Sequence, residues 1–479
     1  MKVLKNLLLL LVSVPLLTAC ALLPKATSRA KLLAMPSVSS SLGGDAQAEQ
    51  IVRAWPKAQW WLVLHNAELN RLLTEALQHN PSLHAATARV AQAEALSDSQ
   101  AAELLPSVNA NVDLHQRQFS GTDFYGPNGG KVFTGAYIDP IVFRYHIDLW
   151  GKDKATLEAM LGKEHAQAAE LAMARLLLST AITRTYIRLC AAQEDIDLYH
   201  ELTGQAEGQQ QLAQVRWQRG LTSQDPVYAS GQQVEAARQQ EASIRNQAHI
   251  LRHRLAGLAG QGPDWGEGIR PEIGAIAGTL PPPDAVALGL LVHRPDVAAA
   301  LWQVQAAAKL IKVAQTRFYP DINLVGFAGL RSLNLKDLFL SNGASVAYGV
   351  GPTLSLPIFE GGRLAAALKN QQAAYDIAVE TYNGTLLAAV QQVADSVSEW
   401  RQTVAHDASQ ARALEAAKQA AQLADQRYQA GLSPRDGVLV AESALLQQRL
   451  LSSERRAAHL LAAVGLIEAL GGGYQMPTP

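Results

Sequence analysis

The stretch Asn80-Pro81-Ser82-Leu83-His84-Ala85-Ala86 recurs 214 positions later as Arg294-Pro295-Asp296-Val297-Ala298-Ala299-Ala300. In each copy a second proline follows 25 residues after the first, at Pro106 and at Pro320. A short alternating segment begins directly after each of these second prolines. A repeat of this length indicates one structural unit built twice.

A second motif repeats at nearly the same offset. Arg216-Trp217-Gln218-Arg219-Gly220-Leu221 matches Arg427-Tyr428-Gln429-Ala430-Gly431-Leu432, which lies 211 positions later. The duplication therefore extends over most of the chain.

The N-terminus has the pattern of a secretory signal. Lys2 and Lys5 precede an apolar run over 7–17, and Leu17-Thr18-Ala19-Cys20 follows. A charged segment, a short apolar segment and small residues before a cut predict a cleaved leader. The last four residues resemble the bacterial lipobox, so Cys20 is the predicted lipidated first residue of the mature chain. The alternative is an incidental cysteine in a discarded leader. Ala21 follows instead of aspartate, and in enterobacterial-type sorting this points to the outer membrane.

Composition narrows the class of protein. The formal net charge is −1 and no basic cluster is present, so no nucleic-acid partner is predicted. Cys190 is the one cysteine besides Cys20, which excludes an intrachain disulfide in the mature protein. Aromatic residues make up only 6%, which favours long helices packed through small side chains. After the leader no apolar run reaches about 18 residues, so no transmembrane helix is predicted. A role in the membrane would have to use strands.

Four segments, two in each repeat, alternate apolar and polar residues. Alternation over about 10 residues is typical of a transmembrane barrel strand, apolar toward lipid and polar toward the lumen. A half-buried sheet of a soluble protein gives the same pattern, so that alternative stays open. The segment 322–330 is the weakest because glycine and alanine dilute it. The apolar positions of the others are Val108, Ala110, Val112 and Leu114; Ile141, Phe143, Tyr145, Ile147 and Leu149; Val346, Tyr348, Val350, Leu354 and Leu356.

Long helices are predicted between the strands. The segments 152–219 and 363–430 each have 68 residues without proline, roughly 100 Å as a single helix. Shorter helices over 81–105 and 226–260 in the first half, and 295–319 and 434–470 in the second, would lie beside them. In the second long helix one apolar series has the 3.5-residue average spacing of a coiled-coil seam: Leu386, Val390, Val393, Val397, Trp400 and Val404.

Closure of the sheet determines the predicted assembly. Four strands cannot close a barrel, and an open edge in hydrocarbon leaves backbone groups unpaired at a cost of several kcal/mol each. With cyclic symmetry, three protomers supply twelve strands. The predicted fold is an α+β membrane protein: a homotrimeric 12-stranded β-barrel, four strands per protomer, continued by a long α-helical coiled-coil tunnel in the periplasm.

The predicted domain boundaries follow from the repeat. They are 1–19, lipoprotein signal peptide; 20–80, lipid anchor, linker and start of the equatorial region; 81–260, first repeat (helix, two strands, long helix, helix); 261–294, inter-repeat equatorial segment; 295–470, second repeat; and 471–479, C-terminal tail.

Several motifs in order resemble the TolC outer membrane efflux family, and within it the NodT-type, OprM-like lipoprotein branch. They are Trp60-Trp61 with Asn80-Pro81-Ser82-Leu83, Arg89-Val90-Ala91-Gln92-Ala93, Arg294-Pro295-Asp296-Val297, Phe318-Tyr319-Pro320 and Gly351-Pro352-Thr353-Leu354-Ser355-Leu356-Pro357-Ile358-Phe359 before Gly361-Gly362-Arg363. The resemblance implies a homotrimeric exit duct of a tripartite pump. Its implied partners are outer membrane lipid, a periplasmic membrane-fusion adaptor and an inner-membrane transporter of the resistance-nodulation-division or major-facilitator type.

The same resemblance places a gate at two helix turns. In the family, the turns at Gly220-Leu221 and Gly431-Leu432 line the closed periplasmic aperture. The branch often carries an aspartate immediately before the alanine that corresponds to Ala441. This chain has Val440 there, with Glu442 two residues on, and it has Asp436 one turn earlier, where the branch has leucine. The usual carboxylate ring is therefore displaced or absent.

The acids at these turns have two interpretations. Ser433, Pro434 and Asp436 fit an N-cap, a proline at N1 and an acid at N3, and 222–226 repeats this logic around Asp225. Capping alone would explain both acids. The alternative is an added gating role, in which they pair with Arg216, Arg219 or Arg427, cations that the helix macrodipole also favours at these ends.

No enzyme or cofactor is predicted. His249 and His253 are four residues apart but lack the glutamate of a zinc protease motif, and a solvated pair is the preferred interpretation. Three functions remain: an efflux duct for drugs or other small toxic molecules, a type I protein secretion duct, and a structural coiled-coil envelope lipoprotein. The lipobox and the branch motifs favour the first.

Overall fold

The structure is a computed structural model that describes residues 30–34, 36, 59–122, 126–271, 294–339 and 342–475. The predicted signal peptide and Cys20 lie outside these residues. The described chain forms two compact units. The first takes its main segments from 90–167 and 300–382, and the second from 59–89, 168–299 and 383–475. Each unit thus combines segments from both halves of the sequence.

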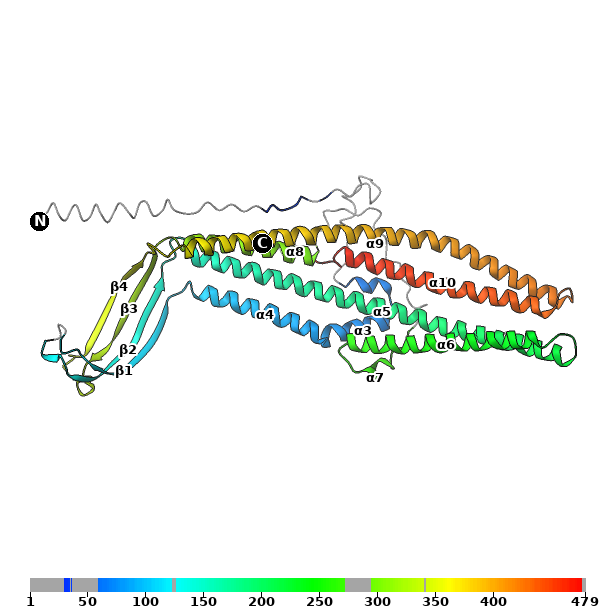
Figure 1. Cartoon of the computed structure of the whole chain (residues 1–479), viewed down its shortest axis with the longest axis horizontal. Coiled ribbons are helices and arrows are strands. Elements are labelled where there is room, and N and C mark those ends of the chain that lie inside the picture. Colours follow the sequence, from blue (N-terminus) through cyan, green and yellow to red (C-terminus); the bar gives the residue numbers. More distant parts are fainter. Residues whose placement is uncertain are drawn as a thin grey trace. The chain divides into compact units, whose positions relative to one another are not determined.

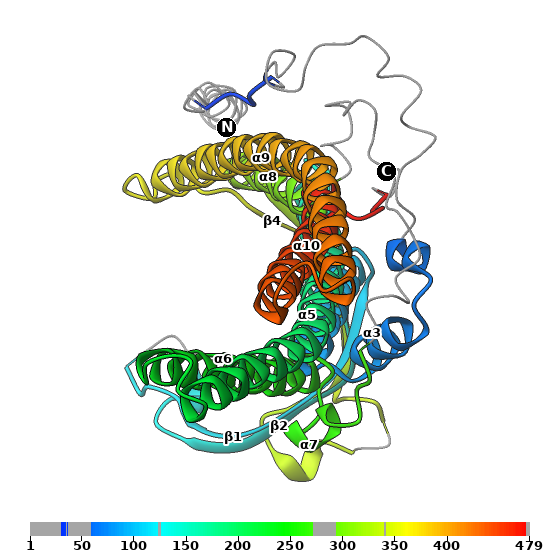
Figure 2. The same cartoon turned by 90° about the vertical axis from the view of Figure 1, so that its right-hand side faces the viewer.

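The first unit contains the sheet. The strands are β1 (Ser107–Gln118), β2 (Val132–His146), β3 (Asp321–Ser332) and β4 (Val346–Ser355), all antiparallel and in the order β1-β2-β3-β4 (Figure 1). In the perpendicular view β1 and β2 curve along their length (Figure 2). Two strands per repeat were predicted, and this is confirmed.

The second strand differs from the prediction over 141–149. It begins at Val132, earlier than predicted. A bulge between Ile138 and Ile141 interrupts the alternation, so the sequence pattern did not reveal the first half of the strand. It ends at His146, because the carboxylate of Asp148 accepts hydrogen bonds from the Lys152 and Lys154 backbone N–H groups at 2.6 and 3.0 Å. These bonds begin the next helix.

The helices match the predicted lengths closely. They are α4 (Pro81–Ala102), α5 (Lys152–Gln218), α6 (Asp225–Leu258), α8 (Pro295–Thr316), α9 (Arg363–Gln429) and α10 (Arg435–Ala469). Both long helices, α5 and α9, have 67 residues and are continuous. Alanine, glutamine and leucine, which propagate a helix well, dominate both.

The second unit holds the main apolar core. A short 3₁₀-helix, η3 (Trp60–Leu64), and α3 (Ala67–His79) pack with α5, α6 and α10. Asn66 begins α3 by accepting a hydrogen bond from the Leu69 N–H at 2.8 Å. The short helix α7 (Pro263–Gly266) follows α6. Burial of each large side chain here contributes about 1.5–3 kcal/mol. The largest fully buried members include Leu64, Leu69, Leu72, Leu73, Ile182, Tyr186, Ile187, Leu189 and Leu255.

Elsewhere the helices approach through small residues. A Cβ on Gly162 of α5 would lie 3.2 Å from the Ala306 Cβ of α8, so the two backbones are close together. The predicted seam of α9 is buried at Leu386, Val393 and Val397, whereas Val404 is exposed. The seam therefore has a partner within the chain over only part of its length.

The helix α8 passes a composition test for a membrane span that the sequence analysis did not anticipate. It is long and apolar enough to cross a membrane, and nearly half of its apolar part is buried within the chain. Core helices of soluble proteins pass the same test, and α8 packs against α5 through alanines. This feature alone is weak evidence for a span.

Candidate functional site

The register of the sheet separates its two faces. Apolar residues of all four strands fall in the same cross-strand rows, for example Val112–Ile138–Leu330–Val346 and Val108–Phe143–Gly326–Val350. The alternate rows carry the polar residues, for example His146–Asn323–Thr353, together with a few apolar ones such as Val142 and Phe327. Val112 and Val350 are more than half exposed. One face is therefore apolar yet open to its surroundings, as a lipid-facing wall requires.

The polar face carries an ion pair between β2 and β3. Arg331 donates to both carboxylate oxygens of Asp139, at 3.1 and 2.8 Å, and the Asp139 side chain is almost fully buried. The guanidinium also lies 3.8 Å from the ring centroid of Phe327. Because Asp139 lies in the bulge of β2, the pair ties the irregular part of β2 to β3.

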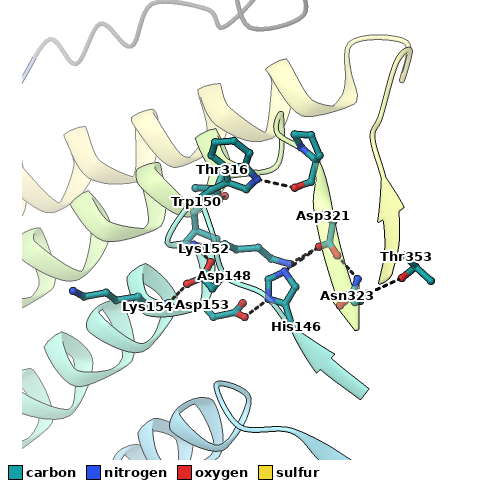
Figure 3. Close-up of polar contacts among 12 residues, drawn as sticks. His146, Asp148, Trp150, Lys152, Asp153, Lys154, Thr316, Asp321, Asn323 and Thr353 are labelled. Carbon is teal, nitrogen blue, oxygen red and sulfur yellow. Dashed lines mark hydrogen bonds and ion pairs between the residues drawn. The ribbon is translucent and has the colours of Figure 1, made fainter. Parts of the chain in front are cut away.

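A second polar cluster occupies the junction of strands and helices in the first unit (Figure 3). His146, the last residue of β2, contacts Asp153 in the first turn of α5 through Nδ1, and its Nε2 lies 3.5 Å from Asp321 Oδ2 at the start of β3. Trp150 donates from Nε1 to the Pro320 carbonyl at 2.8 Å and stacks on Tyr319. The cluster thus joins the junctions of both repeats.

The cluster also contains the one group of potential metal ligands found among the described residues. Ligand atoms of His146, Asp148 and Asp153 lie within 4.8 Å of one another. However, Asp148 already accepts two backbone N–H groups and Asp153 contacts the imidazole. The Lys152 ammonium lies 3.5 Å from the neighbouring Asp321. These partners favour a hydrogen-bonded network over a cation site.

The two predicted helix turns have the same construction in the second unit. Gly220 and Gly431 adopt positive φ angles of 72° and 71°. The next residue in each turn donates its N–H to the helix, Leu221 to the Arg216 carbonyl and Leu432 to the Arg427 carbonyl, both at 2.8 Å. This is the Schellman arrangement, which needs a residue that tolerates the left-handed region. The leucine side chains at both turns are exposed.

Among the predicted gate residues, the structure brings Arg216 and Asp436 together. Arg216 Nη1 lies 2.5 Å from Asp436 Oδ2, and the two side chains are 38% and 45% exposed. They join the end of α5 to the first turn of α10. The pair is accessible to water, so it contributes about 0.5–1 kcal/mol in one chain.

The capping interpretation of Ser433 is wrong. The helix α10 begins at Arg435, its N-cap is Pro434 in an extended conformation, and no side chain caps it. Likewise α6 has Gln224 as its N-cap without a side-chain bond, and Asp225 lies in the first turn. Proline at the N-cap and proline at N1 have similar φ angles, so the sequence did not distinguish them.

The remaining predicted site residues are not part of that pair. Asp225 accepts from the Ser223 hydroxyl at 3.1 Å, and Glu442 accepts from the Gln205 amide at 3.3 Å. Val440 is exposed. For Arg219 and Arg427, the described part of the chain shows no ion pair. His249 and His253 lie half-exposed beside Glu267, at 3.0 and 3.8 Å.

The pattern of the whole chain matches a known family. The model of the outer membrane efflux protein family matches residues 72–261 and 289–472. The chain belongs to this family. The chain is 35% identical over 333 residues to the fusaric acid resistance protein FusA of Burkholderia cepacia, a match that spans 68% of this chain and 62% of FusA. It is 28% identical to the multidrug resistance outer membrane protein MdtP of Escherichia coli over 97% of this chain and 95% of MdtP.

Two solved structures have a similar fold. The outer membrane protein VceC of Vibrio cholerae has a TM-score of 0.79 at 32% identity, with 88% of this chain and all of VceC covered. The CmeC channel of Campylobacter jejuni has a TM-score of 0.81 at 20% identity, covering 95% of this chain and 96% of CmeC, and supports the fold alone. The protein is therefore a homotrimeric outer membrane channel, with a 12-stranded barrel and a helical periplasmic tunnel, and serves as an exit duct of efflux pumps. The solved structures similar to it include outer membrane channels.

Three features were missed by the sequence analysis: the Asp139–Arg331 pair, the His146 cluster and the half-buried Asp195 on α5. In the sequence, His146 is one of the polar positions of an alternating segment. The available signal was a charged or titratable residue within or at the end of a predicted strand. The β3 partners of Asp139 and His146 lie 175 or more positions later in the chain, so these contacts could be found only from the register of β2 and β3.

Proposed function

We propose that this chain is the passive, gated exit duct of a tripartite efflux pump that exports drugs or other small toxic molecules. The family and the names of FusA and MdtP support this cargo class. The apolar, exposed face shared by four strands carries the proposal, because it is explained by a lipid-facing barrel wall. A structural coiled-coil lipoprotein would have no use for that face.

The partners follow from the same architecture. An adaptor of the membrane-fusion class would dock at the helix turns, where Leu221 and Leu432 present exposed apolar side chains. Behind it, the pump would be a transporter of the resistance-nodulation-division or major-facilitator type. Lipidation at Cys20 would add a second anchor to the outer membrane.

The gate is proposed to lie at the same turns. Arg427 and Asp225 are the repeat counterparts of Arg216 and Asp436, 211 positions away in each case. Among the residues that the structure describes, Arg216 pairs with Asp436 within one chain, whereas Arg427 and Asp225 form no such pair. In a closed ring of three protomers, Arg427 of one protomer would pair with Asp225 of the next. Six alternating pairs would then hold the aperture closed.

Efflux measured in cells tests the proposed function. We expect a strain lacking the gene to accumulate a fluorescent efflux dye and to become sensitive to several drugs. The wild-type gene should restore both, and an assembly-defective Val112→Arg variant should not. Unchanged dye accumulation together with loss of one secreted protein would instead indicate the type I secretion duct. Absence of a heat-modifiable trimer in membranes would indicate the structural lipoprotein.

A further inference from the structure

A cavity of about 450 Å³ lies between α5, α9 and α10 in the second unit. Arg184 and Arg188 of α5 and Arg455 of α10 line it, and we call it the arginine trough. Small ligands usually bind in cavities of about 300–1,000 Å³ that combine apolar walls with a few polar groups, and the trough has this character. Its floor is a stretch of α10 with small or apolar residues: Ala458, Leu461, Ala462 and Gly465.

The three arginines differ in their partners. Arg184 pairs with Glu468 at 3.1 Å, and a Cβ on Gly465 would lie 3.4 Å from its Nη2, so this guanidinium lies over the bare backbone of α10. Glycine destabilises a helix interior relative to alanine, and here it leaves room for the arginine. For Arg188 and Arg455, no ion pair is found in the described part of the chain. These two guanidinium groups are therefore available to a ligand.

The acids that line the trough do not balance its cations. They are Glu399 and Asp407 of α9, and Asp407 already contacts the His459 imidazole, whose Nδ1 lies 3.2 Å from Oδ2. With the histidines counted as neutral, the lining carries three positive and two negative charges. A bound anion would remove this imbalance.

The trough lies on the face of the helices opposite the main apolar core. Ile182 and Tyr186 of α5 belong to that core, which η3 and α3 cover. At 3.6 residues per turn, Arg184 and Arg188 point roughly 160° away from them around the helix. The wall of a tunnel can carry covering elements only on its outer face, because the inner face must leave the passage open. The trough thus faces the lumen, where cargo passes.

We propose that the arginine trough binds small organic anions that combine a carboxylate with an apolar body. The planar guanidinium fork matches a carboxylate in two parallel hydrogen bonds, which Arg188 and Arg455 would supply. The apolar body would lie on the small residues of α10. Three such troughs in the trimer would favour anionic cargo in the tunnel, so the inference rests on the proposed efflux function and names a cargo class within it.

Isothermal titration calorimetry on the full-length trimer in mild detergent tests the binding site with three probes. Salicylate has both the carboxylate and the apolar ring, salicylamide has the ring without the charge, and acetate has the charge without the ring. We expect salicylate to bind at least tenfold more tightly than either of the others. Arg188→Gln and Arg455→Gln should each weaken salicylate binding, and the double variant should weaken it at least tenfold, as the loss of charge-assisted hydrogen bonds would give.

The matched control is Arg456→Gln, one residue further along α10. Arg456 lies outside the trough and pairs with Glu194 at 3.4 Å, so this variant should bind salicylate like the wild type. If the double variant fails to assemble, the two single variants decide. Salicylate binding no tighter than that of salicylamide, or wild-type binding in assembled arginine variants, would overturn the proposal.

A second measurement tests whether the trough acts on what passes through the tunnel. The reversal potential of the trimer in planar bilayers under a KCl gradient gives the permeability ratio of anions to cations. We expect this ratio to fall at least twofold in the Arg188→Gln, Arg455→Gln double variant and to stay unchanged in Arg456→Gln. An unchanged ratio in the double variant would contradict the lumenal position. Calorimetry involves no transport, so absent salicylate binding counts against the trough alone, whereas unchanged dye accumulation in the deletion strain counts against the efflux function.

Discussion

Arg216 and Asp436 lie 220 positions apart in the chain, yet Nη1 of one is 2.5 Å from Oδ2 of the other. The pair crosses from the first repeat to the second. Its repeat counterpart, Arg427 with Asp225, is not formed within the described chain. We propose that the second pair forms between protomers, which an internal duplication combined with threefold symmetry would allow.

This arrangement makes a prediction about distances between protomers. The double variant Asp225→Cys, Arg427→Cys should form disulfides between neighbouring protomers under mild oxidation, giving linked dimers and trimers on a non-reducing gel. The matched control, Glu235→Cys with Arg427→Cys, moves one thiol about 15 Å along α6. Equal cross-linking of both variants would contradict the proposed contact.

The two faces of the sheet predict opposite effects of the same substitution. Val112→Arg places a cation in lipid, at a cost of about 2–4 kcal/mol near the bilayer centre, so the yield of heat-modifiable trimer should fall. Asn111→Arg, one residue earlier and on the polar face, should assemble and change ion selectivity. Phe143→Arg should behave like Val112→Arg. If all three variants assemble equally well, the assignment of the faces is wrong.

Asp195 predicts a pH dependence of stability in the periplasmic part of the chain. Burial raises the pKa of Asp195 to about 6, and Glu194 and Glu454 act in the same direction. The folded state thus holds this proton more tightly than the unfolded chain. The resulting stability is fully present below about pH 4, the ordinary aspartate pKa, and is lost as the pH rises through about 6.

Removing the charge should therefore stabilise the protein at neutral pH. Because the side chain is only half-buried, Asp195→Asn should add about 1 kcal/mol per protomer near pH 7.5 and flatten the loss between about pH 4 and 7. Thermal unfolding followed by circular dichroism measures both. The exposed Asp197→Asn serves as the control. An unchanged pH profile in Asp195→Asn would show that another group causes the dependence.

Lipidation should anchor the channel without building it. An acyl chain contributes about 0.8 kcal/mol per buried CH₂, whereas closure of the barrel satisfies whole rows of backbone groups. Cys20→Ser behind a cleavable signal should still give membrane-inserted trimer, measured by fractionation and heat modifiability. Complete loss of trimer from a well-expressed variant would mean that the anchor is needed for assembly.

Much of this architecture could be predicted from the sequence. The absence of proline bounded both long helices to within one residue at each end, because proline is poorly tolerated in a helix interior. The first half of β2 could not be predicted, since the Asp139-Pro140 bulge reverses which face each side chain takes.

The polar contacts were harder to predict from the sequence. Arg216 was one of several cations considered for Asp436, and spacing along the chain could not rank them. His146, Asp153 and Asp321 belong to three elements whose proximity depends on the register of β2 and β3. Composition and periodicity carry no information about that register.

The most direct test of the gated duct is the single-channel conductance of the purified trimer in planar bilayers. Six wet ion pairs of about 0.5 kcal/mol each would together bias the closed state by more than tenfold. No side chain caps α6 or α10, so Asp225→Asn and Asp436→Asn should leave the helix starts intact. We expect low conductance for the wild type and at least a tenfold rise in open probability for the double variant, with each single variant between them. Wild-type conductance in an intact double-variant trimer would contradict the account.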